Sequence, residues 1–115
     1  MTISEFEVKR TEKALDQFLS KRRPPVHIRE EVDLAYRITS QSVELFEIRP
    51  KWDDASTKIE HPAAKATYVK RQECWKVFWF RADEKWHAYE PIPTVKLIED
   101  FLGIVDEDKH GCFFG

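Results

Sequence analysis

Arginine and tryptophan are the side chains in this sequence whose spacing could create a binding site. Arg49 and Trp52 lie on either side of Pro50, and Arg81 and Trp86 lie on either side of a short acidic turn. A guanidinium group beside an indole ring can hold an anion through forked hydrogen bonds while the ring excludes water. Trp and Arg are also enriched among the residues that dominate binding energy. These four residues predict a patch for an anionic or planar partner, such as a carboxylate, a phosphate or a base.

Acid–base chemistry would need a different pair of residues, Glu47 and His87. A histidine held by a carboxylate can act as a general base. With Arg81 as a third member, the pair defines an alternative hypothesis, an enzyme of unknown reaction. No Ser or Cys stands in a nucleophile elbow, and a salt bridge from Glu47 to Arg49 or Arg81 is the simpler interpretation. The catalytic residues therefore stay unassigned.

The sequence gives little support for a metal site or a cofactor site. The four histidines are scattered, and Cys74 and Cys112 lack the close pairing of zinc ligands. The chain has three glycines and no glycine-rich phosphate loop. We therefore expect no metal site and no cofactor.

Nucleic-acid binding is a second alternative hypothesis. Lys65, Lys70, Arg71 and Lys76 lie on or beside two predicted strands that also carry aromatic residues. Sheets with exposed aromatic rings and flanking basic residues bind single-stranded nucleic acids. The formal net charge of −2 gives no general attraction to a polyanion, and no RNP motif is present. This hypothesis ranks below the Arg/Trp patch.

The elements that must position these residues begin with a helix. Ser4 and Glu7 fit a capping box, and Ile3 and Val8 stand where a hydrophobic staple would. Apolar residues then follow at spacings of three and four, which predicts an amphipathic helix. Pro24 and the proline after it end the helix.

The central part of the sequence predicts strands. Alternating or apolar runs occur at residues 32–38, 43–49, 63–70, 74–81 and 86–89, and residues 50–62 are expected to form a loop. A turn at Ser40 and Gln41 would pair Ile38 with Val43. The same register pairs Tyr36 with Leu45, and Leu34 with Glu47.

A short helix is expected after the strands. Pro91 and Pro93 end the sheet region, Thr94 suits an N-cap, and Gly103 can close the helix. The order of elements predicts an α+β domain: an N-terminal helix, an antiparallel β-meander of about five strands and a short C-terminal helix. Both helices should pack on one face of the sheet, in a single domain spanning residues 1–115.

The strand predicted at 74–81 is apolar on both faces. Trp75, Val77 and Trp79 point one way, and Phe78 and Phe80 point the other. Such a strand must be covered on both faces, yet the two helices cover one. The uncovered face favours a homodimer, since monomers rarely expose large apolar patches. Instead of a second subunit, the loop at 50–62, the aromatic residues near the C-terminus or a ligand could cover this face.

The turn after this strand decides which residues share a face. A four-residue turn would pair Arg81 with Trp86 and Phe80 with His87. This register places Trp79, Arg81 and Trp86 on one patch, and His87 and Tyr89 on the reverse face. Trp79 could serve as core, with Arg81 stacked on it, or as part of a site. The predicted binding residues are Glu47, Arg49, Trp52, Trp79, Arg81, Trp86, His87 and Tyr89.

The sequence also indicates where the protein works. No basic and apolar leader opens the chain, and no apolar stretch approaches the length of a membrane span. Two cysteines in 115 residues favour reduced thiols and a cytoplasmic location rather than a disulfide framework.

Several motifs resemble a known family. They are LFEIRPKW at 45–52, WKVFWFR at 75–81, KWHAY at 85–89 and the ending GCFFG at 111–115. In this order and spacing they resemble a family of small bacterial proteins classed as a domain of unknown function. The resemblance spans nearly the whole chain and implies a bacterial single-domain protein. It carries no activity, cofactor or catalytic residue.

Overall fold

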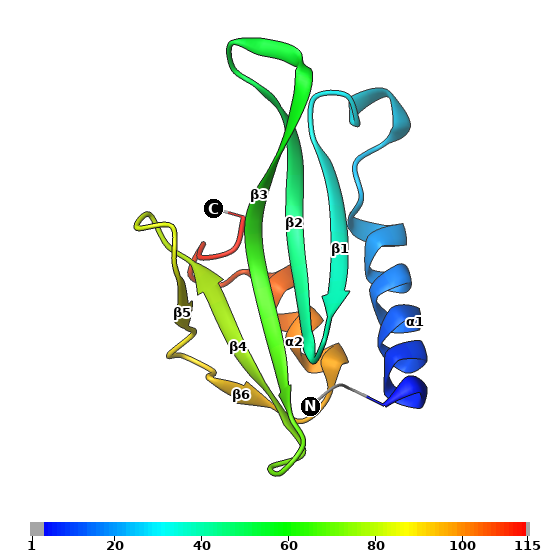
Figure 1. Ribbon diagram of the computed structural model, residues 1–115, viewed down its shortest axis with the longest axis vertical. Coiled ribbons are helices and arrows are strands. Elements are labelled where there is room, and N and C mark those ends of the chain that lie inside the picture. The colour runs from blue at the N-terminus through cyan, green and yellow to red at the C-terminus, as the bar shows by residue number, and fades with distance from the viewer. Residues whose placement is uncertain (1–3, 115) are drawn as a thin grey trace.

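The computed structural model describes residues 4–114 as two helices on a six-stranded antiparallel sheet (Figure 1). The elements are α1 (Glu5–Arg22), the 3-10 turn η1 (Val26–Ile28), β1 (Asp33–Thr39), β2 (Ser42–Lys51), β3 (Asp54–Val69), β4 (Cys74–Phe80), β5 (Trp86–Ala88), β6 (Thr94–Val95) and α2 (Ile98–Glu107). Strands β1 to β5 follow one another in chain order, and β6 pairs with β4. The predicted α+β meander with a helix at each end is confirmed.

Helix α1 begins and ends where the sequence predicts. The Ser4 hydroxyl accepts a hydrogen bond of 3.2 Å from the backbone N–H of Glu7, which satisfies one of the free donors at the helix start. The helix ends at Arg22, two residues before Pro24. Ile3, the predicted staple residue, lies outside the described residues.

The β1–β2 hairpin has the predicted register. Ile38 pairs with Val43, and Leu34 pairs with Glu47. Paired residues share a face, so the buried side chain of Leu34 points to the same side as the fully buried Val43.

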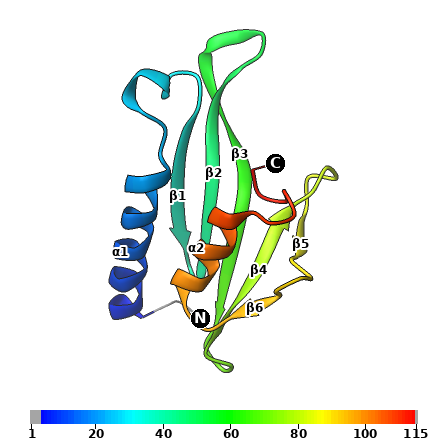
Figure 2. The same ribbon diagram turned by 180° about the vertical axis from the view of Figure 1, so that it is seen from behind.

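The hydrophobic core lies on one face of the sheet. Leu15 of α1 and Phe101 of α2 pack in one buried cluster with Val43, Trp75 and Val77. Figure 2 shows α2 lying across this face, with α1 alongside β1. The prediction that both helices cover the same face is confirmed, and among the described residues no helix lies on the other face of the sheet.

The prediction that residues 50–62 form a loop is wrong. Strand β2 continues to Lys51 and β3 starts at Asp54, so most of this segment forms a hairpin that projects beyond the other strands (Figure 1). The prolines suggested a loop, yet Pro62 lies beside a register shift between β2 and β3. Such irregular positions tolerate proline in a sheet. We call residues 49–61 the β2–β3 arm.

The prediction of how the last helix starts and ends is also wrong. Thr94 pairs with Lys76 in β6 rather than capping a helix. Helix α2 starts at Ile98, and the Asp100 carboxylate accepts a hydrogen bond from the backbone N–H of Leu97. Gly103 lies inside the helix, which ends at Asp108 in the left-handed conformation, with φ of 44°. Aspartate tolerates that conformation better than most residues, so no glycine is needed there.

Candidate binding pocket

The β4–β5 hairpin differs by one residue from its predicted register. Phe80 pairs with Trp86, and Trp79 pairs with His87. Five residues separate the two strands, and the backbone N–H of Arg81 donates to the Lys85 carbonyl within this turn. The predicted patch of Trp79, Arg81 and Trp86 is therefore wrong, because Trp86 points to the opposite face. The expectation that His87 lies on the reverse of Trp79 is wrong for the same reason.

The corrected register brings a different set of predicted residues together. Trp79 and Arg81 of the β4 row share the helix face with His87 and Tyr89 of the β5 row. They line a pocket with a volume of about 270 Å³. Its remaining lining residues are Ala88, Glu90, Pro91 and Cys112. The pocket thus lies between the β4–β5 hairpin and the C-terminal tail.

Arg81 supplies a guanidinium group to this pocket. Its guanidinium carbon lies 5.2 Å from the centre of the Trp79 ring. Within residues 4–114 no carboxylate lies within 4.0 Å of its nitrogens. Two other arginines also stack on aromatic rings, but Arg22 pairs with Asp106 and Arg37 pairs with Glu60. Arg81 thus keeps its hydrogen-bond donors available while the indole holds its position.

His87 has an acidic partner that the sequence analysis did not identify. Its Nε2 atom lies 2.8 Å from the Asp83 carboxylate, and this hydrogen bond is the main reason that the pKa of Asp83 lies below its usual value. Glu47 instead accepts a hydrogen bond of 3.3 Å from Arg49. The pair of Glu47 and His87 that the enzyme hypothesis required is not formed.

Apart from Glu90, the remaining walls of the pocket are neutral or apolar. Tyr89 is buried and its ring lies 5.0 Å from that of Phe113. Burial raises the pKa of the Cys112 thiol, and the Asp108 carboxylate raises it further. A protonated thiol is a poor nucleophile, so Cys112 contributes shape rather than reactivity. Sequence reasoning missed Cys112 because its position depends on the fold of the tail.

Arg49 and Trp52 do not join the pocket. Both belong to the β2–β3 arm, where Arg49 pairs with Glu47 and Trp52 is 93% exposed at the hairpin turn. Of the eight predicted binding residues, Trp79, Arg81, His87 and Tyr89 line one pocket. Glu47, Arg49, Trp52 and Trp86 lie elsewhere.

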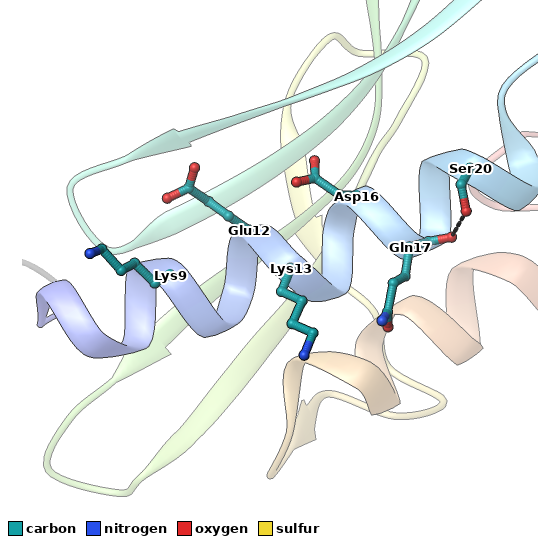
Figure 3. A pocket seen from close by; sticks show the side chains of 6 residues that line it. All are labelled: Lys9, Glu12, Lys13, Asp16, Gln17 and Ser20. Atoms are coloured by element: carbon teal, nitrogen blue, oxygen red, sulfur yellow. Dashed lines mark hydrogen bonds between the residues drawn. The ribbon is translucent and has the colours of Figure 1, made fainter.

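A larger hollow on the molecule carries less chemistry. It runs along α1, has a volume of about 610 Å³, and all six side chains that line it come from this helix (Figure 3). Lys9 and Lys13 alternate with Glu12 and Asp16, so the charges balance along the surface. We interpret it as the solvated face of the helix.

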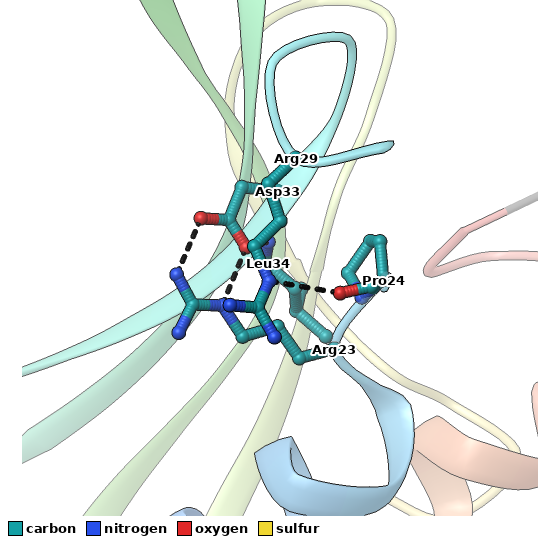
Figure 4. Close-up of polar contacts among 5 residues, drawn as sticks. All are labelled: Arg23, Pro24, Arg29, Asp33 and Leu34. Atoms are coloured by element: carbon teal, nitrogen blue, oxygen red, sulfur yellow. Dashed lines mark hydrogen bonds and ion pairs between the residues drawn. The ribbon is translucent and has the colours of Figure 1, made fainter. Parts of the chain in front are cut away.

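A cluster of polar contacts joins α1 to β1. The Arg23 guanidinium donates two hydrogen bonds of 2.8 Å to the Asp33 carboxylate, and Arg29 donates to the Pro24 carbonyl (Figure 4). The Arg23 hydrogen bond lowers the pKa of Asp33. Both partners are satisfied by each other, so this cluster fixes the fold rather than offering a site.

The fold and the pocket define a class: a small α+β domain with helices on one sheet face, a bare opposite face and a pocket beside the β4–β5 hairpin. The chain belongs to the family described as Domain of unknown function (DUF3024), whose model matches residues 3–115. This confirms the resemblance to a family of unknown function. The comparisons with curated proteins and with solved structures found no match.

No helix within residues 4–114 is long and apolar enough to cross a membrane. In the same range, no group of three or more His, Cys, Asp or Glu side chains is arranged to hold a metal ion.

Proposed function

We propose that this protein is a binding module whose pocket between β4, β5 and the C-terminal tail takes a small anionic ligand with a planar group. Arg81 binds the anionic end of the ligand. The aromatic side chains of Trp79 and Tyr89 contact the planar part. This keeps the class of partner expected from the sequence and moves the site to the helix face of the β4–β5 hairpin.

One observation carries the proposal: Arg81 is stacked on an indole in a pocket and has no carboxylate partner within residues 4–114. An ordered guanidinium loses little conformational freedom when it forms a forked pair with a carboxylate or phosphate. Glu90 also lines the pocket but does not pair with Arg81. We therefore expect the ligand to supply the anionic group that pairs with Arg81.

The size of the pocket sets the scale of the ligand. A volume of about 270 Å³ lies slightly below the usual range for drug-sized ligands, roughly 300–1,000 Å³. A single aromatic ring bearing a carboxylate fits this scale. The cytoplasm remains the proposed location, since both Cys74 and Cys112 are free thiols.

Binding of benzoate, with inorganic phosphate as a second probe, tests the proposal by calorimetry and by intrinsic tryptophan fluorescence, to which Trp79 contributes. We expect benzoate to bind and Arg81→Gln to weaken it by roughly 10- to 100-fold, because a hydrogen bond to a charged group contributes about 1.5–3 kcal/mol. Arg49→Gln is the matched control, since Arg49 lies outside the pocket and is paired with Glu47.

Two results would reject the pocket as an anion site. One is the absence of binding of both probes at millimolar concentration. The other is benzoate binding that is equally strong in the Arg81→Gln variant and the parent protein. Binding of phosphate but not benzoate would retain the anion site and reject the planar part of the ligand.

A further inference from the structure

The bare face of the sheet carries aromatic and basic side chains over β3, β4 and β5. Phe78 and Phe80 alternate with the core residues of β4, and their cross-strand partners Lys65 and Trp86 share their face. Lys76 lies on the same face, in line with Phe78 along β4. Both helices lie on the other side of the sheet (Figures 1 and 2).

The lysine and the rings form one contiguous cluster. The Lys65 ammonium lies 5.7 Å from the centre of the Phe78 ring and 5.6 Å from that of Trp86. The Phe80 and Trp86 rings pack edge to face, with centres 5.1 Å apart. The four side chains are half-buried, so each presents part of its surface to solvent.

This face carries charges of both signs, and among the described residues its two lysines on β3 and β4 lack an ion-pair partner. Within residues 4–114 neither Lys65 nor Lys76 has a carboxylate within 4.0 Å. Glu44 pairs with Lys65 across β2 and β3, but its carboxylate lies 3.9 Å from the Arg37 guanidinium. The ammonium groups of Lys65 and Lys76 thus lie beside exposed ring surface without an ion-pair partner within residues 4–114.

We propose that single-stranded nucleic acid binds across this face. Bases stack on Trp86 and Phe80, and the phosphates contact Lys65 and Lys76. A flexible strand suits the arrangement because every base has a ring face and every linkage a negative charge, so binding needs no base-specific hydrogen bonds. The site lies on the opposite face from the Arg81 pocket and is independent of the proposed ligand there.

The same charges argue against a second copy of the chain as the occupant. A two-fold interface places one patch against itself. Here that would bring Lys65 and Lys76 of each copy, which lack ion-pair partners within residues 4–114, close to those of the other, at a cost in free energy. A polyanion, in contrast, is attracted to the same positive charges.

Fluorescence anisotropy of a labelled twelve-residue oligothymidylate, titrated at several salt concentrations, tests the proposal. We expect micromolar or weaker binding at low salt that falls as salt rises. The double variant Lys65→Gln, Lys76→Gln should reduce the slope of log affinity against log salt by about 1.4, since each neutralised phosphate of a single strand contributes about 0.7. Lys9→Gln, Lys13→Gln on α1 removes the same charge from the helix side and should leave the slope unchanged.

Trp86→Ala tests stacking separately from charge. We expect a loss of affinity of roughly tenfold with an unchanged salt slope, because stacking of one base contributes about 1–3 kcal/mol. Trp86→Phe keeps a ring and should retain most of the affinity, which separates stacking from any change in folding.

Three outcomes would overturn the proposal. The first is no rise in anisotropy at low salt. The second is an equal loss of affinity and slope in the α1 control variant. The third is a doubled molecular mass in light scattering that Phe80→Ser abolishes, which would assign this face to a second copy.

Discussion

Asp33 links the end of α1 to β1 through one carboxylate. It accepts two hydrogen bonds from Arg23 at the end of α1, and one from the backbone N–H of Leu34 in its own strand (Figure 4). Its side chain is largely shielded from solvent. The charged form is favoured in the folded state, so its contribution to stability depends on pH.

Acid should weaken the fold partly through this residue. The pKa of Asp33 is lower in the folded protein than the unfolded value of about 3.9. Its contribution is therefore present above about pH 4 and is lost as pH falls through the folded pKa. We expect Asp33→Asn to lower the melting temperature at pH 7 and to flatten the decline of stability between about pH 4 and pH 2.

Thermal unfolding followed by circular dichroism over this pH range gives the measurement. Asp53→Asn on the exposed arm is the control and should leave the decline of stability at acid pH unchanged. An equally steep decline of stability at acid pH in Asp33→Asn and in the parent protein would contradict this role of Asp33.

At the scale of elements, β4 places one tryptophan in the core and another at the pocket. Trp75 is 2% exposed and packs in the central cluster. Trp79 is half-buried, contacts the edge of that cluster and lines the pocket. The two residues share a face of the sheet but differ in how much of the ring the fold itself covers.

This difference predicts unequal costs of truncation. Trp75→Ala should destabilise the protein by about 3–5 kcal/mol, as expected for a buried aromatic residue. Trp79→Ala should cost about 1–3 kcal/mol, because part of the ring already contacts solvent. Urea denaturation of both variants measures the two values. A cost for Trp79→Ala equal to that for Trp75→Ala would assign Trp79 to the core.

The elements also show what the sequence could predict. The β1–β2 register followed from alternation alone, because two long strands meet at a tight turn whose position Ser40 and Gln41 mark. The β4–β5 register was missed by one residue, since β5 has three residues and its alternation cannot fix the length of the turn. A shift of one residue exchanges faces, so the observed register moves Trp86 out of the site and His87 into it.

The pocket could be predicted in part. Trp79 and Arg81 followed from their shared face of one strand, a local property that the sequence carries. Asp83 and Cys112 could not be found this way. The contact of Asp83 with His87 depends on the conformation of the turn, and the position of Cys112 depends on how the tail packs after α2. The Asp108 carboxylate fixes that tail through the backbone N–H groups of Phe113 and Phe114.

At the scale of the whole molecule, the sheet separates two surfaces and the arm provides a third. The helix face is filled by the core and the pocket, and the bare face carries Lys65, Lys76 and the rings. The arm is long and open: from Lys51 to His61 every residue is exposed. Lys58 connects it to the segment after η1 through a hydrogen bond of 2.8 Å to the Glu30 carbonyl.

The homodimer expected from the sequence remains a prediction, and the arm is where we expect it to form. Trp52 and Val26 are 93% and 73% exposed, Ile59 is 38% exposed, and the arm and η1 lie at the same end of the molecule (Figure 1). Exposed large apolar side chains favour association, and Trp is the residue type most typical of interface hot spots. The arm also carries charges of both signs, so two copies can approach without the repulsion that the bare face imposes.

Light scattering at micromolar concentration should give twice the mass of one chain, and Trp52→Ser should restore the monomer. Phe6→Ser is the matched control, because Phe6 is an equally isolated exposed ring on α1, and this change should leave the dimer intact. At low concentration both variants should have the same melting temperature as the parent protein, since neither ring is part of the core. A monomeric mass for the parent protein at 100-fold higher concentration would end the dimer prediction, and a dimer unaffected by Trp52→Ser would move it to another surface.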